Sequence, residues 1–346
     1  MAKPTPTNPR SGWSGVAMLW GIALVALILH VAIGSGNAGQ PFLFRMNPVE
    51  VVRHLFAGPG LDDSHNHIIW QLRLPRALAC LLVGGLLGSV GSAFQAIFRN
   101  PLAEPYIVGV SSGSAAGGAL ALVLGLGAWA SGLGVMAFAF MGGVGSLALV
   151  LGLAGRRGRT DVQTLLLAGV VIGAMLASVL SLILYSAGMD SNQILRWMLG
   201  STTPMHWNKV AVLAGAFLIG QAILIPQGKR LNTLAMSEET AQRLGVDTKK
   251  LKATVLMAGT GMTAVAVGSV GIIGFLGLVA PHIARRILGV DWRLSLAGAG
   301  AAGATLLLFA DVLAQRVLAG GEIPVGVVTA ILGAPFLLAL IRRQDG

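Results

Sequence analysis

Ionisable side chains within apolar segments are the residues of this 346-residue chain that could do chemistry. Asp311, in the run LLLFADVLAQRVL, is the clearest example. An acid inside a membrane segment either carries a coupled ion or proton or is held by polar partners within the protein. The second interpretation, a structural role, is the better prediction for a single acid.

Two histidines follow two aspartates in Asp62-Asp63-Ser64-His65-Asn66-His67, a pattern that could bind a metal ion. Polar loops of this kind are more often solvated, so we predict no metal site there. His282, after Pro281, is interpreted as part of a helix end rather than as a metal ligand.

Catalytic motifs are absent from the sequence. The pair Gly228-Lys229 is followed by Arg230 and lacks the upstream glycine of a phosphate-binding G-x-x-x-x-G-K-[ST] loop, so this chain is not expected to hydrolyse ATP. No Ser-His-Asp arrangement stands out, and Cys80 is the only cysteine. We therefore predict no catalytic residues, no enzyme activity and no cofactor in this chain.

The elements that must position these residues are membrane helices. Hydrophobic residues make up 55% of the chain and charged residues only 11%, about half the usual share of charged residues. Apolar runs of ~18 or more residues recur along the chain, which indicates an all-α polytopic membrane protein. The net charge of +11 lies in short loops, which suits a membrane orientation rather than nucleic acid.

Ten membrane segments are predicted in one transmembrane domain that spans residues 1–346. The first, which contains Val16–Ile33, is longer than the apolar part of a signal peptide and is expected to be retained. The segments lie near 14–34, 68–92, 108–126, 131–154, 163–187, 210–226, 251–269, 277–288, 292–317 and 326–341, the eighth being too short to span alone.

The distribution of basic residues orients these segments. With the N-terminus inside, the inner side carries 17 and the outer side 7 of the 24 lysines and arginines, so both termini are predicted to be cytoplasmic. The sequence then has a cytoplasmic tail (1–13), an outer loop (36–67) and a long cytoplasmic loop (226–250).

The cytoplasmic loop contains the pattern of a short amphipathic helix. Ser237 can cap it, and Gly245 can end it. Such a helix is either a surface connector or a docking helix for a cytoplasmic partner. The residues expected to carry docking are Glu238, Glu239, Ala241, Leu244 and Gly245.

Several blocks in a fixed order resemble the permease subunits of binding-protein-dependent ABC importers for iron chelates, haem and cobalamin (vitamin B12). The resemblance extends from about Trp70 to Ile341. The blocks are RLPRALA (73–79), FRNPLAEPYIVGVSSG (98–113), LLLAGV (165–170), RWMLGS (196–201), AQRLGV (241–246), GIIGFLGLVAPHIAR (271–285), FAD (309–311) and EIPVGVVTAILGAPFLLAL (322–340).

This resemblance implies a ten-helix, vitamin B12 permease-like fold that pairs as a homodimer in lipid. It also implies two ATPase subunits, which hold ATP and Mg²⁺, and one periplasmic or lipoprotein solute-binding protein. Family roles place Arg73 and Arg76 on the outer surface, docking the binding protein, and residues 237–246 against the ATPase. The third family arginine falls at Gln315, with Arg316 beside it as the expected substitute, although a one-residue shift rotates a side chain ~100° around the helix.

The solute path implied by the resemblance runs along the fifth segment. Its expected lining residues are Met175, Ser178, Ser181 and Tyr185, a face that could also pack against other helices.

The sequence thus predicts the permease of an importer in the bacterial inner membrane, with a ferric siderophore as the default solute. The alternatives are haem or cobalamin as the solute or, in a different class, an ion-coupled secondary transporter that works through Asp311.

Overall fold

The computed structural model describes residues 9–34, 46–60, 64–154, 162–188, 191–318 and 321–342, and these residues form helices and connecting loops without a strand. Each of the ten predicted segments is confirmed as a helix. They are α1 (Pro9–Ile33), α4 (Leu74–Phe98), α5 (Val110–Val123), α6 (Leu133–Ala154), α7 (Val162–Ser186), α9 (Trp207–Met236), α11 (Thr248–Val270), α12 (Leu276–Leu288), α13 (Trp292–Arg316) and α14 (Val325–Arg342).

Seven helices of the described residues are long and apolar enough to cross a membrane, and α5 and α14 are shorter apolar helices. The predicted short helix, α12, has 13 residues and packs against α4, α13 and α14. It begins directly after Phe275, which has a left-handed backbone (φ +64°). Neighbouring helices thus cover a segment that could not span a bilayer alone.

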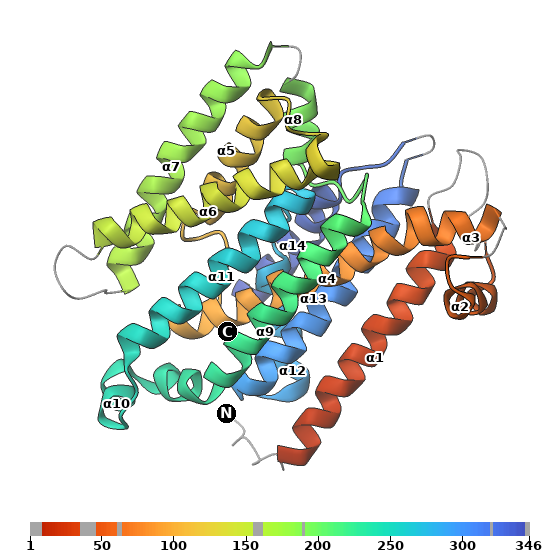
Figure 1. Ribbon diagram of the computed structural model, residues 1–346. Coiled ribbons are helices and arrows are strands. Elements are labelled where there is room, and N and C mark those ends of the chain that lie inside the picture. Colours follow the sequence, from red (N-terminus) through yellow and green to blue (C-terminus); the bar gives the residue numbers. More distant parts are fainter. Residues whose placement is uncertain are drawn as a thin grey trace.

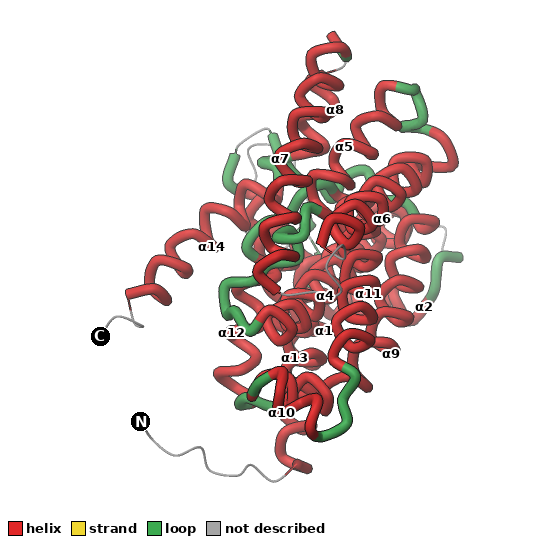
Figure 2. Tube along the Cα trace, turned by 90° about the vertical axis from the view of Figure 1, so that its left-hand side faces the viewer, coloured by secondary structure: helices red, strands yellow, loops and turns green. Residues whose placement is uncertain are grey.

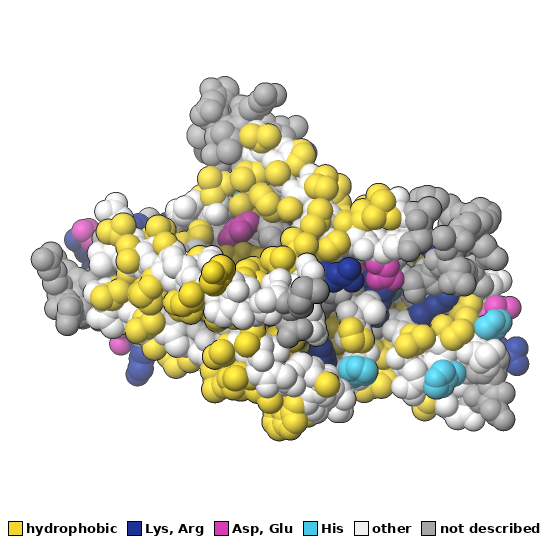
Figure 3. Space-filling view, turned by 90° about the horizontal axis from the view of Figure 1, so that it is seen from above, with side chains coloured by type: hydrophobic (Ala, Val, Ile, Leu, Met, Phe, Trp, Pro, Cys, Tyr) yellow, Lys and Arg dark blue, Asp and Glu magenta, His cyan; other side chains and the backbone are white. Residues whose placement is uncertain are grey.

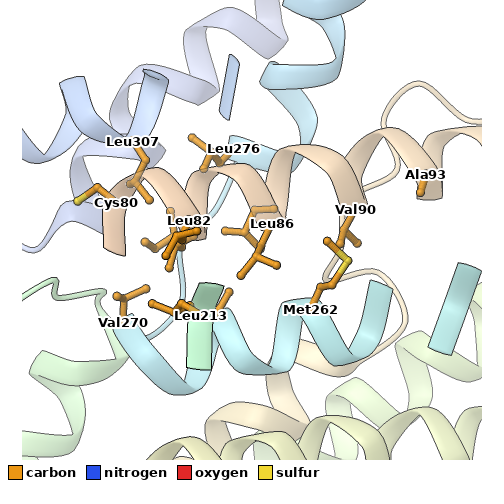
Figure 4. Close-up of a cluster of buried hydrophobic side chains, with 14 of the residues drawn as sticks. Cys80, Leu82, Leu86, Val90, Ala93, Leu213, Met262, Val270, Leu276 and Leu307 are labelled. Atoms are coloured by element: carbon orange, nitrogen blue, oxygen red, sulfur yellow. The ribbon is translucent and has the colours of Figure 1, made fainter. Parts of the chain in front are cut away.

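Helices α4 and α13 form the centre of the bundle (Figure 1). Glycine makes their close contact possible: a Cβ atom at Gly84 would collide with the backbone of Gly303, and one at Gly88 with that of Ala299. Around this pair lies a continuous apolar core, part of which appears in Figure 4, where Leu86 of α4 lies among side chains of α9, α11 and α12.

The peripheral helices surround this centre. Helix α1 packs along α13 on one edge, while α5, α6 and α7 form a second group on the other side (Figures 1 and 2). At one end of the bundle α10 (Glu238–Arg243) stands beside the end of α9, and α1 begins near the same end (Figure 1). The opposite end carries α2 (Pro48–Ala57), α3 (Ser64–Ile68) and α8 (Ser191–Met198).

The predicted outer loop 36–67 contains more structure than expected. Asn47 caps α2 by accepting a hydrogen bond from the N–H of Val49. Helix α3 continues through a π-helical turn, η1 (Ile69–Arg73), into α4. His65 and His67 are exposed on α3, whereas Asp62 and Asp63 lie outside the described residues.

The predicted cytoplasmic loop 226–250 begins later than expected. Helix α9 runs through Pro226 to Met236, and the connection to α11 starts at Ser237. Proline removes one backbone hydrogen bond, but the buried face formed by Leu224, Leu231 and Leu234 continues on both sides of it. Packing on that face keeps the chain helical where proline alone would favour a break.

Candidate solute and coupling sites

A buried charge cluster lies at the end of the bundle predicted to face outward, with Asp311 at its centre. Arg76 donates from Nε to Oδ2 (2.8 Å) and from Nη2 to Oδ1 (3.0 Å), a bidentate ion pair between α4 and α13. Thr202 donates to Oδ1 (2.6 Å) and Gln315 to Oδ2 (2.7 Å). His30 Nε2 lies 2.7 Å from Oδ2.

Asp311 is fully buried, and both of its oxygens are occupied. The structural interpretation of this acid therefore fits the geometry, with a guanidinium group as the main partner. Arg76 also donates from Nη1 to Oε1 of Glu322 (3.0 Å), a residue just before α14. One arginine thus holds α4, α13 and the segment before α14 together.

Arg73 and Arg316 converge on the end of α1. Arg73 donates from Nη1 to the carbonyl oxygens of Val31 (2.9 Å) and Ala32 (3.3 Å). Arg316 donates from Nη2 to those of Ile33 (2.6 Å) and Gly34 (3.0 Å). The last carbonyls of a helix have no partner within it and attract cations, so these contacts stabilise the end of α1.

Arg73 and Arg76 lie at the end of the bundle that is predicted to face outward, but their side chains are buried rather than exposed on its surface. Their residue exposures are only 8% and 9%, because Arg73 caps α1 and Arg76 is paired with Asp311. The predicted rotation between positions 315 and 316 is confirmed: Gln315 joins the charge cluster, whereas Arg316 turns towards α1.

Sequence reasoning missed two members of the cluster. His30 belongs to α1, and Thr202 lies in the loop after α8, each more than 100 positions from Asp311. Neither residue carries a local signal, because their contacts depend on how distant helices pack. The loop of Thr202 is fixed by a hydrogen bond from the N–H of Ser201 to the carbonyl of Val270 (2.8 Å).

Possible metal ligands also meet here, because ligand atoms of His30, Cys80 and Asp311 lie within 4.8 Å of one another. The Asp311 oxygens already accept from several donors, and the Arg76 cation would repel an incoming metal ion. The donor set therefore does not fit a metal centre.

A cavity of about 760 Å³ adjoins the charge cluster, and we call it the outer cavity. Its walls come from α8, the start of α9, the turn before α6 and residues 321–325. Three cations line it: Arg76, Arg196 and Lys209. A second cavity, of about 710 Å³, lies at the opposite end, where α4, α9 and α12 end beside α10.

Helix α10 has the predicted caps. Ser237 Oγ accepts from the N–H of Thr240 (2.9 Å), and Gly245 has a left-handed backbone (φ +80°). The amphipathic pattern suggests that Ala241 and Leu244 share one apolar face of this helix, and the structure contradicts this: Ala241 is buried, whereas Leu244 follows the last helical residue and is 68% exposed. The exposed Leu244 side chain and the charged helix α10 thus lie at the tip of the bundle, where a partner could bind.

An ion pair joins α10 to the membrane helix α11. Lys252 Nζ donates to Glu238 Oε1 at 2.6 Å, and the residue exposure of Lys252 is only 5%. The neighbouring Glu239 is exposed. A displacement of α10 would thus act directly on α11.

Helix α7 is the least buried of the seven long helices. Met175 is 47% and Tyr185 88% exposed, and Ser178 and Ser181 are exposed with their hydroxyls donating to carbonyls one turn earlier. Hydrophobic side chains cover much of the surface seen from above in Figure 3. All four predicted path residues are thus exposed on α7. Such a surface suits either a solute passage or contact with a helix of a partner.

The chain matches the FecCD transport family over residues 22–343. It belongs to this family. A FecCD permease is a membrane component of ABC importers and is not itself catalytic.

Named relatives of this FecCD permease include vitamin B12 transporters. The vitamin B12 import permease BtuC of Salmonella typhi is 37% identical over 330 residues, covering 94% of this chain and 95% of the relative. The cobalamin import permease of Halobacterium salinarum is 35% identical, with 83% and 76% covered. The uncharacterised ABC transporter permease YvrB of Bacillus subtilis is 36% identical, with 93% and 92% covered.

A solved inward-facing structure of a transporter classed as metal-chelate type ABC has the same fold. It superposes with a TM-score of 0.81 at 30% identity, covering 97% of this chain and 100% of that one. This similarity confirms the predicted permease fold, and family membership confirms a multi-pass protein of the bacterial inner membrane.

Proposed function

We propose that this chain is the permease subunit of a cobalamin importer. The observation that carries the proposal is its similarity, over nearly the full length of both chains, to a permease named for vitamin B12 import. The ferric siderophore expected from sequence, and haem, are the competing solutes within the same class of bulky metal chelates. Energy comes from a separate ATPase, which suits the exposed tip formed by α10 and Leu244.

The alternative of an ion-coupled carrier fits the geometry poorly. It requires Asp311 as an accessible coupling group, but this acid is buried and bound to Arg76, Thr202, Gln315 and His30. A proton or ion would have to displace the bidentate guanidinium group first.

The deciding experiment is uptake into vesicles that contain this permease, its ATPase and its binding protein, with cobalamin, a ferric siderophore and haem compared. We expect cobalamin to accumulate only when both ATP and the binding protein are present. Accumulation of a ferric siderophore or haem instead would reassign the solute within the family. Uptake that follows a proton gradient without ATP would contradict the importer assignment.

The docking role expected for Arg73, Arg76 and Arg316 stays a proposal. An acidic group of the binding protein would have to compete with the carbonyls of α1 or with Asp311 and Glu322 for these guanidinium groups. Arg316 is the most accessible of the three, since it is half-buried.

The path along α7 also stays a proposal, in which two copies of the chain form the passage between their exposed α7 faces. Cys80 is fully buried, so new cysteines can be labelled selectively. In vesicles, we expect Ser178→Cys and Ser181→Cys to react with a membrane-impermeant maleimide, and bound solute to slow this reaction. Leu218→Cys, on an exposed position of α9, is the control for a lipid-facing site. Equal, solute-independent labelling at all three positions would exclude a path along α7.

A further inference from the structure

The outer cavity contains a cation that the charge cluster does not use. Lys209, in the first turn of α9, lines the cavity and is half-buried. Both acids of the cavity wall, Asp311 and Glu322, are paired with Arg76. Among the described residues, no carboxylate lies within ion-pair distance of Lys209.

The Lys209 side chain packs against Gly132, in the turn before α6. Gly132 has a left-handed backbone (φ +89°), and a Cβ atom there would lie 2.5 Å from Cε and 2.7 Å from Nζ of Lys209. The lysine therefore lies in the space that a larger residue would fill. A lysine that merely anchors a helix at the membrane surface extends its ammonium group to bulk water, which differs from this arrangement.

The size and charge of the cavity indicate the class of ligand. Pockets for small molecules have volumes of roughly 300–1,000 Å³, and the outer cavity falls in this range at about 760 Å³. Arg196 of α8 adds a second positive charge and Trp197 an apolar surface. Arg76 and its two acids together carry one net negative charge, and Lys209 and Arg196 add two positive charges. The lining of the outer cavity therefore has a net positive charge, which attracts an anion.

We infer that the outer cavity is a solute site for an anionic oxygen group, carboxylate or phosphate, and that Lys209 is its specificity-determining cation. This inference rests on the proposed function, in which the chain passes a metal chelate. A chelate bearing such a group would hold it against Lys209, while neutral chelates would gain nothing from the lysine.

The test measures binding to the purified permease alone, by calorimetry in detergent, with two matched pairs of probes. The first pair is a ferric tricarboxylate chelate and an uncharged ferric trihydroxamate. The second is cyanocobalamin, whose nucleotide arm contains a phosphodiester, and cobinamide, a corrinoid without that arm. Only the first member of each pair bears the anionic group, a carboxylate in one pair and a phosphodiester in the other, so the pair that responds identifies the group recognised.

We expect Lys209→Met to weaken binding of at least one probe that bears a carboxylate or phosphodiester about tenfold, as for the loss of one charge-assisted hydrogen bond, and to leave the counterpart without that group unchanged. Lys209→Arg, which keeps the charge, should retain most of the affinity. Lys229→Met makes the same change at the other end of α9, and should have no effect.

Three results would overturn the inference: no probe binds, the two members of each pair weaken equally, or Lys209→Met changes nothing. Asp190 lies outside the described residues, so the affinities are also measured with Asp190→Asn. An affinity that rises in this variant would mean that Lys209 is already paired within the chain, which also contradicts the inference. Because uptake is not the readout, failure here leaves the cobalamin assignment to its own experiment.

Discussion

Replacement of Asp311 by asparagine should destabilise the protein by about 3–5 kcal/mol, the range for removing one partner of a buried ion pair. The side chain of Asp311 is fully buried and that of Arg76 is 11% exposed, so water cannot compensate the lost charge. Asparagine also places an NH₂ group among donors from Arg76, Thr202 and Gln315. Thermal unfolding of the purified permease in detergent, followed by circular dichroism, measures the loss.

A matched control lies in the same cluster. Glu322 accepts from the same arginine, but its side chain is 37% exposed. Solvent screening reduces such a pair to about 1 kcal/mol or less, so Glu322→Gln should change stability only slightly. The double variant Arg76→Gln/Asp311→Asn leaves only the partly exposed Glu322 carboxylate without its partner and no buried unpaired charge, so it should recover part of the stability. Equal stability of Asp311→Asn and the native protein would contradict a structural role for the cluster.

The helices could be predicted from sequence because apolar length and loop charge are local signals. All ten segments appeared, yet the break expected near Pro226 did not, since the buried leucines of α9 outweigh one missing hydrogen bond. Helices α2 and α3 were missed because they are short and lie in a polar stretch.

The site was less predictable because its contacts are long-range. Asp311 and Arg76 stood out as charges beside or within apolar runs, but nothing local indicates that His30 and Thr202 reach the same carboxylate. The direction in which each side chain points could not be predicted from the sequence either. Arg73 and Arg76 are three residues apart, yet one caps α1 while the other binds α13.

The tie between α10 and α11 should depend little on pH in the neutral range. Burial alone would raise the pKa of the Glu238 carboxyl, but the hydrogen bond and charge of Lys252 outweigh it and hold the pKa below 4.5. A lowered folded-state pKa contributes stability above the ordinary value, and this is lost as the pH falls through the lowered one. The contact should therefore persist from about pH 5 upward.

Glu238→Gln should uncouple ATP hydrolysis from transport. It leaves the buried Lys252 without its carboxylate, so movement of α10 is transmitted less effectively to α11. We expect uptake by the complete complex to fall about tenfold, the order associated with one charge-assisted hydrogen bond, while its basal ATPase activity persists. Uptake and phosphate release are measured on the same vesicles, so that their ratio reports coupling.

The adjacent acid provides the control, because Glu239 is exposed and Glu239→Gln makes the same chemical change one position further on. It should leave the ratio of uptake to hydrolysis unchanged if the tie to α11 is what matters. Exchanging the charges in Glu238→Lys/Lys252→Glu should restore part of the coupling that each single change removes, because the pair would form again in reverse. If Glu238→Gln and Glu239→Gln reduced uptake equally, the effect would belong to the charge of the α10 surface, and the tie to α11 would carry no motion.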